Sequence, residues 1–399
     1  MPNTAHFRFD QRYLIVFGAC LTQFTVIGLM FSYALFFKYF ETEFGWSRTL
    51  LSACLSFAFF TMGVLAFFGG QLSDRFGPRI VLAIAGTLLG IGWMLLSRVT
   101  EPWQLFVFFG LLLGAGMGTH DVVTLPTIAK WFEKRRGIMT GVVKVGTAVG
   151  QVTVPPLVAL LLTLTDWRLV LVIVGAAAIA LLLLAAFLLR APPKATLQSQ
   201  NDAAGGLTFA EARRTPRLWM LCFIQFSFFP ALMTIPLHLP VHGMDLGMSQ
   251  GMAATLLSVI GATSVAGRLL VGACADRLGG KRAFVLCFVP LIISLSLFPL
   301  ITAPWLLFPA VIIYGFGHGG FFTVVAPTIA EYFGLKAHGT IFGLVLFFGT
   351  IGGATGPIVA GRFFDTTQSY TPAFVSLAAL AAIGLLVVLR LPRAGTGRQ

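Results

Sequence analysis

The polar stretch Gly70-Gln-Leu-Ser-Asp74-Arg75-Phe-Gly77-Pro-Arg79 separates two long apolar runs. It returns about 202 residues later as Gly272-Ala-Cys-Ala-Asp276-Arg277-Leu-Gly279-Gly-Lys281-Arg282. Further pairs repeat in the same order at nearly the same offset: Cys20–Thr25 with Cys222–Ser227, Pro126–Phe132 with Pro327–Phe333, and Gly137 and Gly141 with Gly339 and Gly343. Four ordered matches predict two equivalent halves, residues 1–189 and 218–399, joined by a linker at 190–217.

Composition places the chain in a membrane. Of its 399 residues, 57% are hydrophobic and 10% are charged, whereas a soluble domain carries about 25% charged residues. Because so little polar material cannot coat a soluble core, lipid is the expected solvent. Twelve apolar runs are each long enough to cross a hydrocarbon core of about 30 Å. They cover residues 13–37, 49–72, 80–97, 103–129, 138–163, 168–189, 218–241, 250–274, 283–301, 304–330, 340–361 and 371–389.

The sequence therefore predicts an all-α membrane protein with twelve transmembrane helices. Six of them precede the repeat point. Because six is an even number, both halves run in the same direction across the membrane and are parallel.

The distribution of Lys and Arg predicts the orientation. With the N-terminus in the cytoplasm, 20 of the 27 basic residues fall on the cytoplasmic side and 5 on the other, while Lys144 and Arg268 lie inside predicted helices. This asymmetry follows the positive-inside rule and places both termini in the cytoplasm. The cytoplasmic set is Arg8, Arg12, Arg75, Arg79, Lys130, Lys134, Arg135, Arg136, Arg190, Lys194, Arg213, Arg214, Arg217, Arg277, Lys281, Arg282, Lys336, Arg390, Arg393 and Arg398.

Several classes of function are not indicated. The net charge of +13 is explained by topology, so no nucleic-acid partner is expected. The five cysteines show no paired spacing, and neither a metal site nor a cofactor is indicated. An enzyme would need a cluster of nucleophile, base or metal ligands, which is not found. The short loops are typical of a bacterial inner-membrane protein, and a monomer is expected.

The loop at Gly70–Arg79 and its repeat resemble the signature loop between helices 2 and 3 of the major facilitator superfamily, and the resemblance covers essentially the whole chain. Three further segments resemble its monocarboxylate porter branch, and oxalate/formate-type anion exchangers share much of that pattern. These segments are Phe44–Arg48, Gly267-Arg268, and Tyr332–Leu335 with Gly339–Gly343. The resemblance implies alternating access by rocking of the two halves, with a substrate site near the midplane between them.

The resemblance also implies a gate at the cytoplasmic loops. Asp74 and Asp276 are placed where a carboxylate could meet a helix N-terminus of the other half, which favours negative charge. Such contacts would exist only while the cytoplasmic side is closed and would bias the two states. The alternative is a tight glycine turn with charges that only set topology. The candidate cations are Arg75, Arg79 and Arg277, and their candidate partners are Glu133 and Glu331.

Three charged residues are expected inside the membrane, where ionisable groups are costly and usually mark a pathway. Arg268, Lys144 and Asp121 each lie eight or nine residues from a charged residue at the cytoplasmic end. All three are therefore about 12–14 Å deep and share one layer. Two cations and one carboxylate leave one positive charge, which an anionic substrate would balance.

Arg268 is the expected main ligand of this anion, because a guanidinium holds a carboxylate through two parallel hydrogen bonds. Lys144 is the expected second contact. The alternatives are a structural ion pair between Arg268 and Asp121, and a purely ion-pairing role for Lys144.

A proton carrier is expected beside the anion. Members of the monocarboxylate branch often carry an acidic residue four positions before the arginine that corresponds to Arg268. This chain has Ser264 at that position. Asp121 could replace that acid, and His120 beside it titrates near neutrality when unperturbed. The alternative is that Asp121 permanently neutralises Lys144.

Gln23 and Gln225, related by the repeat, and Tyr33 are further candidate ligands, although buried polar groups also bond merely to other helices. The leading prediction is a proton-coupled secondary transporter of a small organic anion resembling a monocarboxylate. The alternatives are a proton-independent organic anion exchanger and an exporter of a small drug-like molecule.

Overall fold

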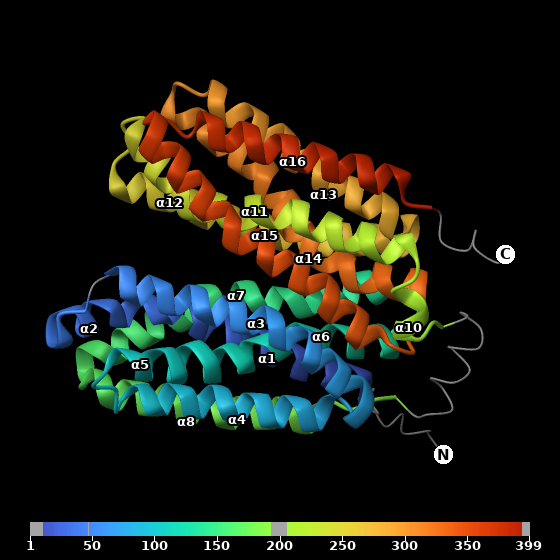
Figure 1. The fold of residues 1–399 in the computed structure, drawn as a ribbon, viewed down its shortest axis with the longest axis horizontal. Helices are drawn as coiled ribbons and strands as arrows, with labels where there is room; N and C mark the ends of the chain where they lie inside the picture. The colour runs from blue at the N-terminus through green and yellow to red at the C-terminus, as the bar shows by residue number, and fades with distance from the viewer. Residues whose placement is uncertain (1–10, 47, 193–205, 393–399) are drawn as a thin grey trace, which may run out of the picture.

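The computed structural model describes residues 11–46, 48–192 and 206–392, and these residues form helices without any strand (Figure 1). Twelve of the helices are long and apolar enough to cross a membrane, so the twelve-helix prediction is confirmed. The basic residues Arg8, Lys194, Arg393 and Arg398, counted above, lie outside the described residues.

The first half contains α1 (Gln11–Ser32), a 3₁₀ turn (Tyr33–Phe36), α2 (Phe37–Phe44), α3 (Arg48–Phe76), α4 (Pro78–Leu96), α5 (Pro102–Leu105), a π-helical segment (Phe106–Leu113), α6 (Gly114–Trp131), α7 (Arg136–Leu164) and α8 (Trp167–Leu188). The second half contains α11 (Pro216–Asp245), α12 (Gln250–Leu278), α13 (Gly280–Leu297), two 3₁₀ turns (Phe298–Leu300, Pro304–Leu306), α14 (Leu307–Phe333), α15 (His338–Thr367) and α16 (Thr371–Arg390).

The first predicted span differs most from the structure. It was expected to continue to residue 37, but the membrane-spanning helix ends at Ser32. The chain tightens into the 3₁₀ turn and then forms α2 as a separate helix. The linker contains one short helix among its described residues, α10 (Phe209–Ala212). A capping box between Thr208 and Glu211 starts it, as this residue pair favours.

The two copies of the repeated loop adopt the same turn. Gly77 and Gly279 have φ values of 88° and 81°, which residues with a Cβ rarely adopt. Each glycine lets one helix end and the next begin at once, so α3 turns directly into α4 and α12 into α13. The repeated Asp-Arg-x-Gly pattern therefore has a local physical cause.

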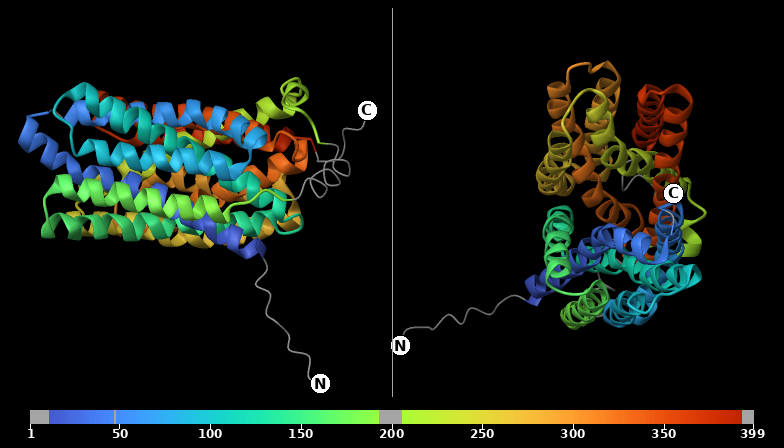
Figure 2. Two further views of the ribbon diagram at one scale, coloured as in Figure 1. Left: turned by 90° about the horizontal axis from the view of Figure 1, so that it is seen from below. Right: turned by 90° about the vertical axis from the view of Figure 1, so that its left-hand side faces the viewer.

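The first six and the last six membrane helices form two separate bundles that lie side by side (Figures 1 and 2). The start of α1, the end of α16, the turn between α3 and α4 and the turn between α12 and α13 all lie at one end of the paired bundles. We call this end the basic end and the other the opposite end.

The halves pack closely at the basic end because glycines remove side chains from the contact. A Cβ on Gly137 would lie 2.1 Å from the carbonyl oxygen of Gly272, and one on Gly70 would lie 2.1 Å from that of Gly339. Nearer half depth, a Cβ on Gly141 would lie 2.5 Å from the carbonyl oxygen of Arg268. The backbones of α7 and α12, and of α3 and α15, therefore touch between the halves, so the protein is closed at this end.

Adding a methyl group to this contact should open the basic end. Gly137→Ala is expected to weaken the closed arrangement by about 1–3 kcal/mol, because an overpacked contact must shift. Spin labels on the exposed residues Arg79 and Lys336, one in each half at this end, should move apart when native cysteines are replaced by alanine. Gly361→Ala is the matched control, since a Cβ there meets nothing within 4 Å. Equal label distances in both variants would contradict the expectation.

Candidate functional site

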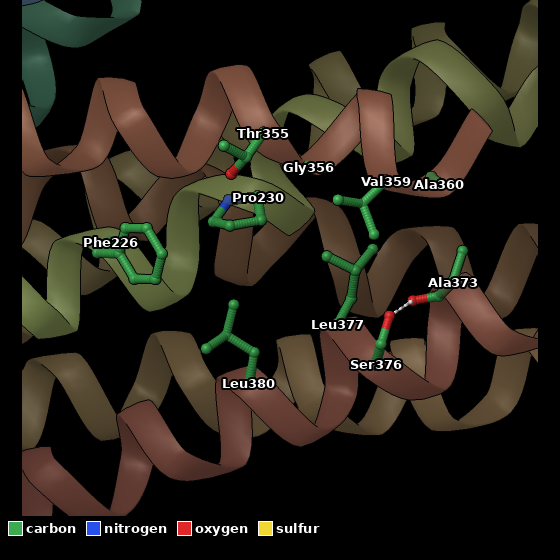
Figure 3. Close-up of a pocket in the computed structure, with 10 residues that line it drawn as sticks. All are labelled: Phe226, Pro230, Thr355, Gly356, Val359, Ala360, Ala373, Ser376, Leu377 and Leu380. Atoms are coloured by element: carbon green, nitrogen blue, oxygen red, sulfur yellow. Dashed lines mark hydrogen bonds between the residues drawn. The ribbon is translucent and has the colours of Figure 1, made fainter. Parts of the chain in front are cut away.

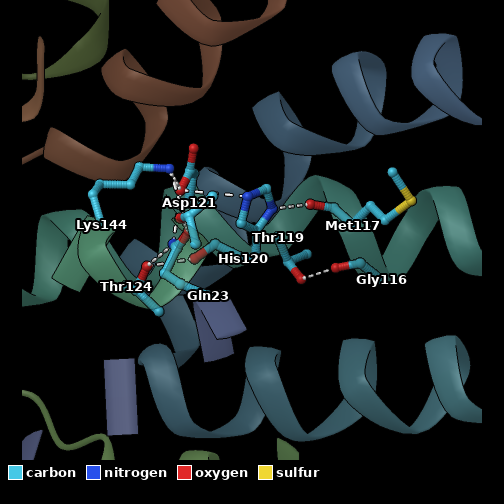
Figure 4. A network of polar contacts seen from close by, with 9 residues as sticks. Gln23, Gly116, Met117, Thr119, His120, Asp121, Thr124 and Lys144 are labelled. Atoms are coloured by element: carbon cyan, nitrogen blue, oxygen red, sulfur yellow. Dashed lines mark hydrogen bonds and ion pairs between the residues drawn. The ribbon is translucent and has the colours of Figure 1, made fainter. Parts of the chain in front are cut away.

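A buried ion pair lies inside the N-terminal half (Figure 4). Lys144 on α7 donates through Nζ to Oδ1 of Asp121 on α6 at 2.6 Å. The same oxygen accepts a hydrogen bond from Nε2 of Gln23 on α1 at 2.8 Å. Because both charged side chains are buried, each depends on the other for compensation.

Gln23 holds the three helices of this cluster together. Its Oε1 accepts from Nζ of Lys144 at 3.3 Å and from Oγ1 of Thr147 at 3.1 Å. Its Nε2 also donates to Oγ1 of Thr124 at 3.0 Å. Both ends of the amide are thus engaged by protein groups in this conformation, so Gln23 positions the ion pair. Its predicted contact with a ligand stays a prediction.

His120 closes the cluster on its other side. Its Nε2 lies 3.5 Å from Oδ1 of Asp121, and its Nδ1 contacts the carbonyl oxygen of Met117. Adjacent residues of an α-helix point about 100° apart, yet the imidazole of His120 bends back to the neighbouring carboxylate. A proton on His120 would therefore change the charge beside Asp121 directly.

Arg268 comes to the cluster from α12 in the other half. Its NH1 donates to the backbone carbonyl of Lys144 at 2.9 Å. The side chain is only 3% exposed, and its buried Nε has no hydrogen-bond partner. Arg268 forms no ion pair with any residue that the structure describes. The alternative pairing of Arg268 with Asp121 is therefore not formed, because Asp121 is engaged by Lys144.

An aromatic ring that the sequence reasoning missed lies beside both cations. The ring centre of Phe322 on α14 is 5.1 Å from Nζ of Lys144 and 5.7 Å from Cζ of Arg268. The face of an aromatic ring attracts cations. The repeat could have indicated this residue, because Phe322 stands five residues before Pro327, as Asp121 stands five before Pro126.

Two predicted ligands are not joined to the cluster by any contact that the structure describes. Gln225 is buried against α15, and a Cβ on Gly349 would lie 3.0 Å from its Nε2. The ring of Tyr33 stacks on that of Phe109 with centroids 3.6 Å apart. Both stay predictions as substrate contacts.

The two repeated aspartates cross between the halves at the basic end. Asp276 accepts hydrogen bonds from the backbone N–H groups of Gly137 and Ile138, at 2.6 and 2.9 Å. These groups begin α7, so the carboxylate meets a helix N-terminus, where negative charge is favoured. This is the contact that the sequence predicted.

Asp74 makes the equivalent contact with α15. It accepts from the backbone N–H groups of Gly339 and Thr340, at 3.2 and 2.9 Å, and from Oγ1 of Thr340 at 3.1 Å. Lys130 donates to it through Nζ at 3.1 Å. We call these two sets of bonds the Asp74 latch and the Asp276 latch.

The ion pairs predicted for the adjacent arginines are not formed in this conformation. Arg75 and Arg277 are exposed and pair with no acidic residue of the described chain; Arg75 lies over the ring of Phe76, 5.2 Å from its centre. Glu331 instead accepts from the N–H of Gly280 at 2.8 Å within its own half. Lys130 is the cation of the Asp74 latch, because its side chain reaches the carboxylate from α6.

Two like helical bundles with charged groups between them at half depth define a class, the membrane transporters. The family model of the Major Facilitator Superfamily matches residues 19–357 and 245–399, so the chain belongs to this superfamily. It is an integral multi-pass membrane transporter and not an enzyme.

Among its relatives, monocarboxylate transporter 13 of Rattus norvegicus is 29% identical over 390 residues, which is 95% of this chain and 89% of that protein. An agnestins efflux protein of Paecilomyces divaricatus is 25% identical over 366 residues, covering 88% and 80% of the two chains. The structure of a proton:xylose symporter bound to 6-bromo-6-deoxy-D-glucose matches with a TM-score of 0.78 and 14% identity over 96% of each chain. This last likeness concerns the fold.

Removing the buried carboxylate should destabilise the protein strongly. Asp121→Asn leaves Lys144 charged and unpaired in the interior, which costs about 3–5 kcal/mol. The double variant Asp121→Asn with Lys144→Met should recover most of that loss. Thermal unfolding in detergent measures both.

Glu43→Gln provides the matched control, because it breaks an ion pair with Arg168 whose side chains are 37% and 39% exposed. Such a surface pair contributes at most about 1 kcal/mol. A loss at Asp121 no greater than that at Glu43, or a double variant no more stable than Asp121→Asn, would contradict the assignment of a buried pair.

Proposed function

We propose that this protein transports a small organic anion with one carboxylate, by alternating access. The charge of the buried layer carries the proposal. Lys144 and Arg268 supply two positive charges, and among the described residues Asp121 is the one carboxylate paired with either of them. With His120 neutral, the layer has one surplus positive charge in a poorly solvated interior. One carboxylate from a substrate balances it.

Arg268 is the proposed anchor of the substrate carboxylate. A guanidinium has five N–H donors, and a single hydrogen bond joins that of Arg268 to the described chain. The remaining donors suit a bidentate carboxylate. Since Arg268 belongs to the C-terminal half and Lys144 to the N-terminal half, a bound anion attracts both halves. Phe322 offers an apolar face beside the charged groups for the substrate's carbon chain.

The route to this anchor runs from the opposite end. Lys144, Thr147 and Gln151 follow one face of α7 at helical spacing. Their exposure rises along the helix, from 2% at Lys144 to 9% at Thr147, and Gln151 is exposed. The two latches meanwhile hold the basic end closed. Rocking of the halves would break the latches and the bond from Arg268 to the carbonyl of Lys144, and would open the site to the other side.

We place the basic end in the cytoplasm on the basis of the Lys and Arg asymmetry, and the protein as a monomer in a bacterial inner membrane.

Asp121 and His120 are the proposed proton carriers, because a proton on either would lower the negative charge that competes with the substrate for Lys144.

Proton-independent exchange is the second candidate. Asp121 receives close hydrogen bonds from Lys144 and Gln23, which favour a permanently ionised carboxylate. Ser264 also stands where a coupling acid is common in the monocarboxylate branch. Two buried cations disfavour the export of a cationic drug-like molecule, because like charges repel.

Transport in proteoliposomes tests the anion anchor. The measured quantity is the uptake of small radiolabelled monocarboxylates. Arg268→Gln should lower the apparent affinity for them about 10- to 150-fold, because a lost hydrogen bond to a charged group costs about 1.5–3 kcal/mol. Arg268→Lys should retain part of the activity. Arg98→Gln, at an exposed arginine, serves as the control and should behave like the unaltered protein. Undiminished uptake by Arg268→Gln would remove this residue from the site.

A pH gradient separates the two coupling modes. For a symporter, acid outside the vesicles accelerates net uptake, and this acceleration is lost when Asp121 and Lys144 are replaced together by Asn and Met. For an exchanger, uptake needs an anion inside the vesicle and ignores the gradient. Uptake that follows the gradient equally in the double variant would exclude Asp121 as the proton carrier.

A further inference from the structure

A groove separate from the central site lies in the C-terminal half, between α11, α15 and α16 (Figure 3). Its volume is about 170 Å³, somewhat more than the roughly 150 Å³ of an apolar cavity that holds benzene. Its walls include Phe226 and Pro230 of α11, Val359 of α15 and Leu377 of α16. The helix α16 packs on α11, α13 and α15 of its own half and runs along the outer side of the bundle in Figure 1.

The groove suits an apolar occupant. The hydroxyl groups that line it are already satisfied by their own helices: Thr355 donates to the carbonyl of Gly352 at 3.0 Å, and Ser376 to that of Ala373 at 2.9 Å. The wall therefore presents no unpaired side-chain polar group. Val359 at the mouth of the groove is 47% exposed, so the groove is open along α15. In a membrane, the apolar solvent at such a mouth is the acyl chains of lipids.

A charged residue stands above the groove on the same helix face. Thr355, Val359 and Arg362 are spaced i, i+4 and i+7 on α15 and so share one face. Arg362 lies 24 residues after His338, the start of α15, which is about 36 Å of helix. This exceeds a hydrocarbon thickness of about 30 Å and places the guanidinium at headgroup depth.

Arg362 is also unusual in its position. In the described part of the C-terminal half, every other Lys or Arg belongs to the basic end, apart from the buried Arg268. The side chain of Arg362 is exposed and forms no ion pair with a described residue. Arg362 therefore lies at the end of the bundle that has few Lys and Arg residues, one helical turn beyond an apolar groove. A cation in this place suits the phosphate of a phospholipid, because arginine binds phosphate through two hydrogen bonds.

We propose that this groove is a phospholipid-binding site, with an acyl chain between α11, α15 and α16 and the phosphate on Arg362. A lipid bound at this site would lie between α15 and α16, and α15 also takes part in the Asp74 latch. It does not depend on the identity of the transported molecule.

Native mass spectrometry of the purified protein in dodecyl maltoside tests the proposal. The probes are dioleoylphosphatidylglycerol and dioleoylglycerol, which have the same chains with and without phosphate. The unaltered protein should bind the phospholipid at least about tenfold more tightly than the diacylglycerol. Arg362→Gln should remove that difference, and Val359→Trp, which fills the mouth of the groove, should weaken both lipids about tenfold.

Ile358→Trp is the matched control, because Ile358 is a 70% exposed neighbour that does not line the groove. It should bind both lipids as the unaltered protein does, and thermal unfolding should show all three variants folded. The site is overturned if Val359→Trp binds the phospholipid as tightly as Ile358→Trp does. The role of Arg362 is overturned if Arg362→Gln keeps the preference for phosphate. A lipid-free dimer that Val359→Trp dissociates would instead make this face a contact between two copies.

Discussion

The ion pair between Lys144 and Asp121 is the interaction on which the functional centre depends. Two charges at half depth in a membrane are tolerable only when each compensates the other. Gln23 fixes their geometry from a third helix, so α1, α6 and α7 are tied together at one point. This pair is neutral as a unit, and Arg268 forms no ion pair with a carboxylate of the described residues. The proposed anion anchor rests on that unpaired charge.

The two halves share a scaffold but not their chemistry. At the repeat positions of Asp121, Lys144 and Arg268 the other half carries Phe322, Leu346 and Ala66. The charged layer is therefore built from two residues of the first half and one of the second. Phe322 lies beside both cations, whereas its counterpart Asp121 pairs with Lys144. A scaffold with two equivalent halves thus surrounds an asymmetric cluster of charges.

The contact between the halves combines close packing with breakable bonds. Glycines such as Gly137 and Gly272 allow backbones to touch, which gives dispersion attraction without interlocked side chains. Asp74 and Asp276 add hydrogen bonds to helix N-termini of the opposite half. Since these bonds join the two halves, they stabilise the arrangement that is closed at the basic end rather than the fold of either half.

The sequence by itself determined the class, the number of helices and the two-half plan. Apolar run length and the repeat around Gly70–Arg79 report single helices and their turns, which are local properties. The depth of Arg268, Lys144 and Asp121 also followed from helical rise. Tertiary structure alone decided how these charges pair. It brought Lys130 to Asp74, left Arg75 and Arg277 exposed and paired Lys144 with Asp121, while Arg268 forms no ion pair within the described part of the chain. Pairing depends on the rotation and approach of helices far apart in the chain, which helical periodicity does not record.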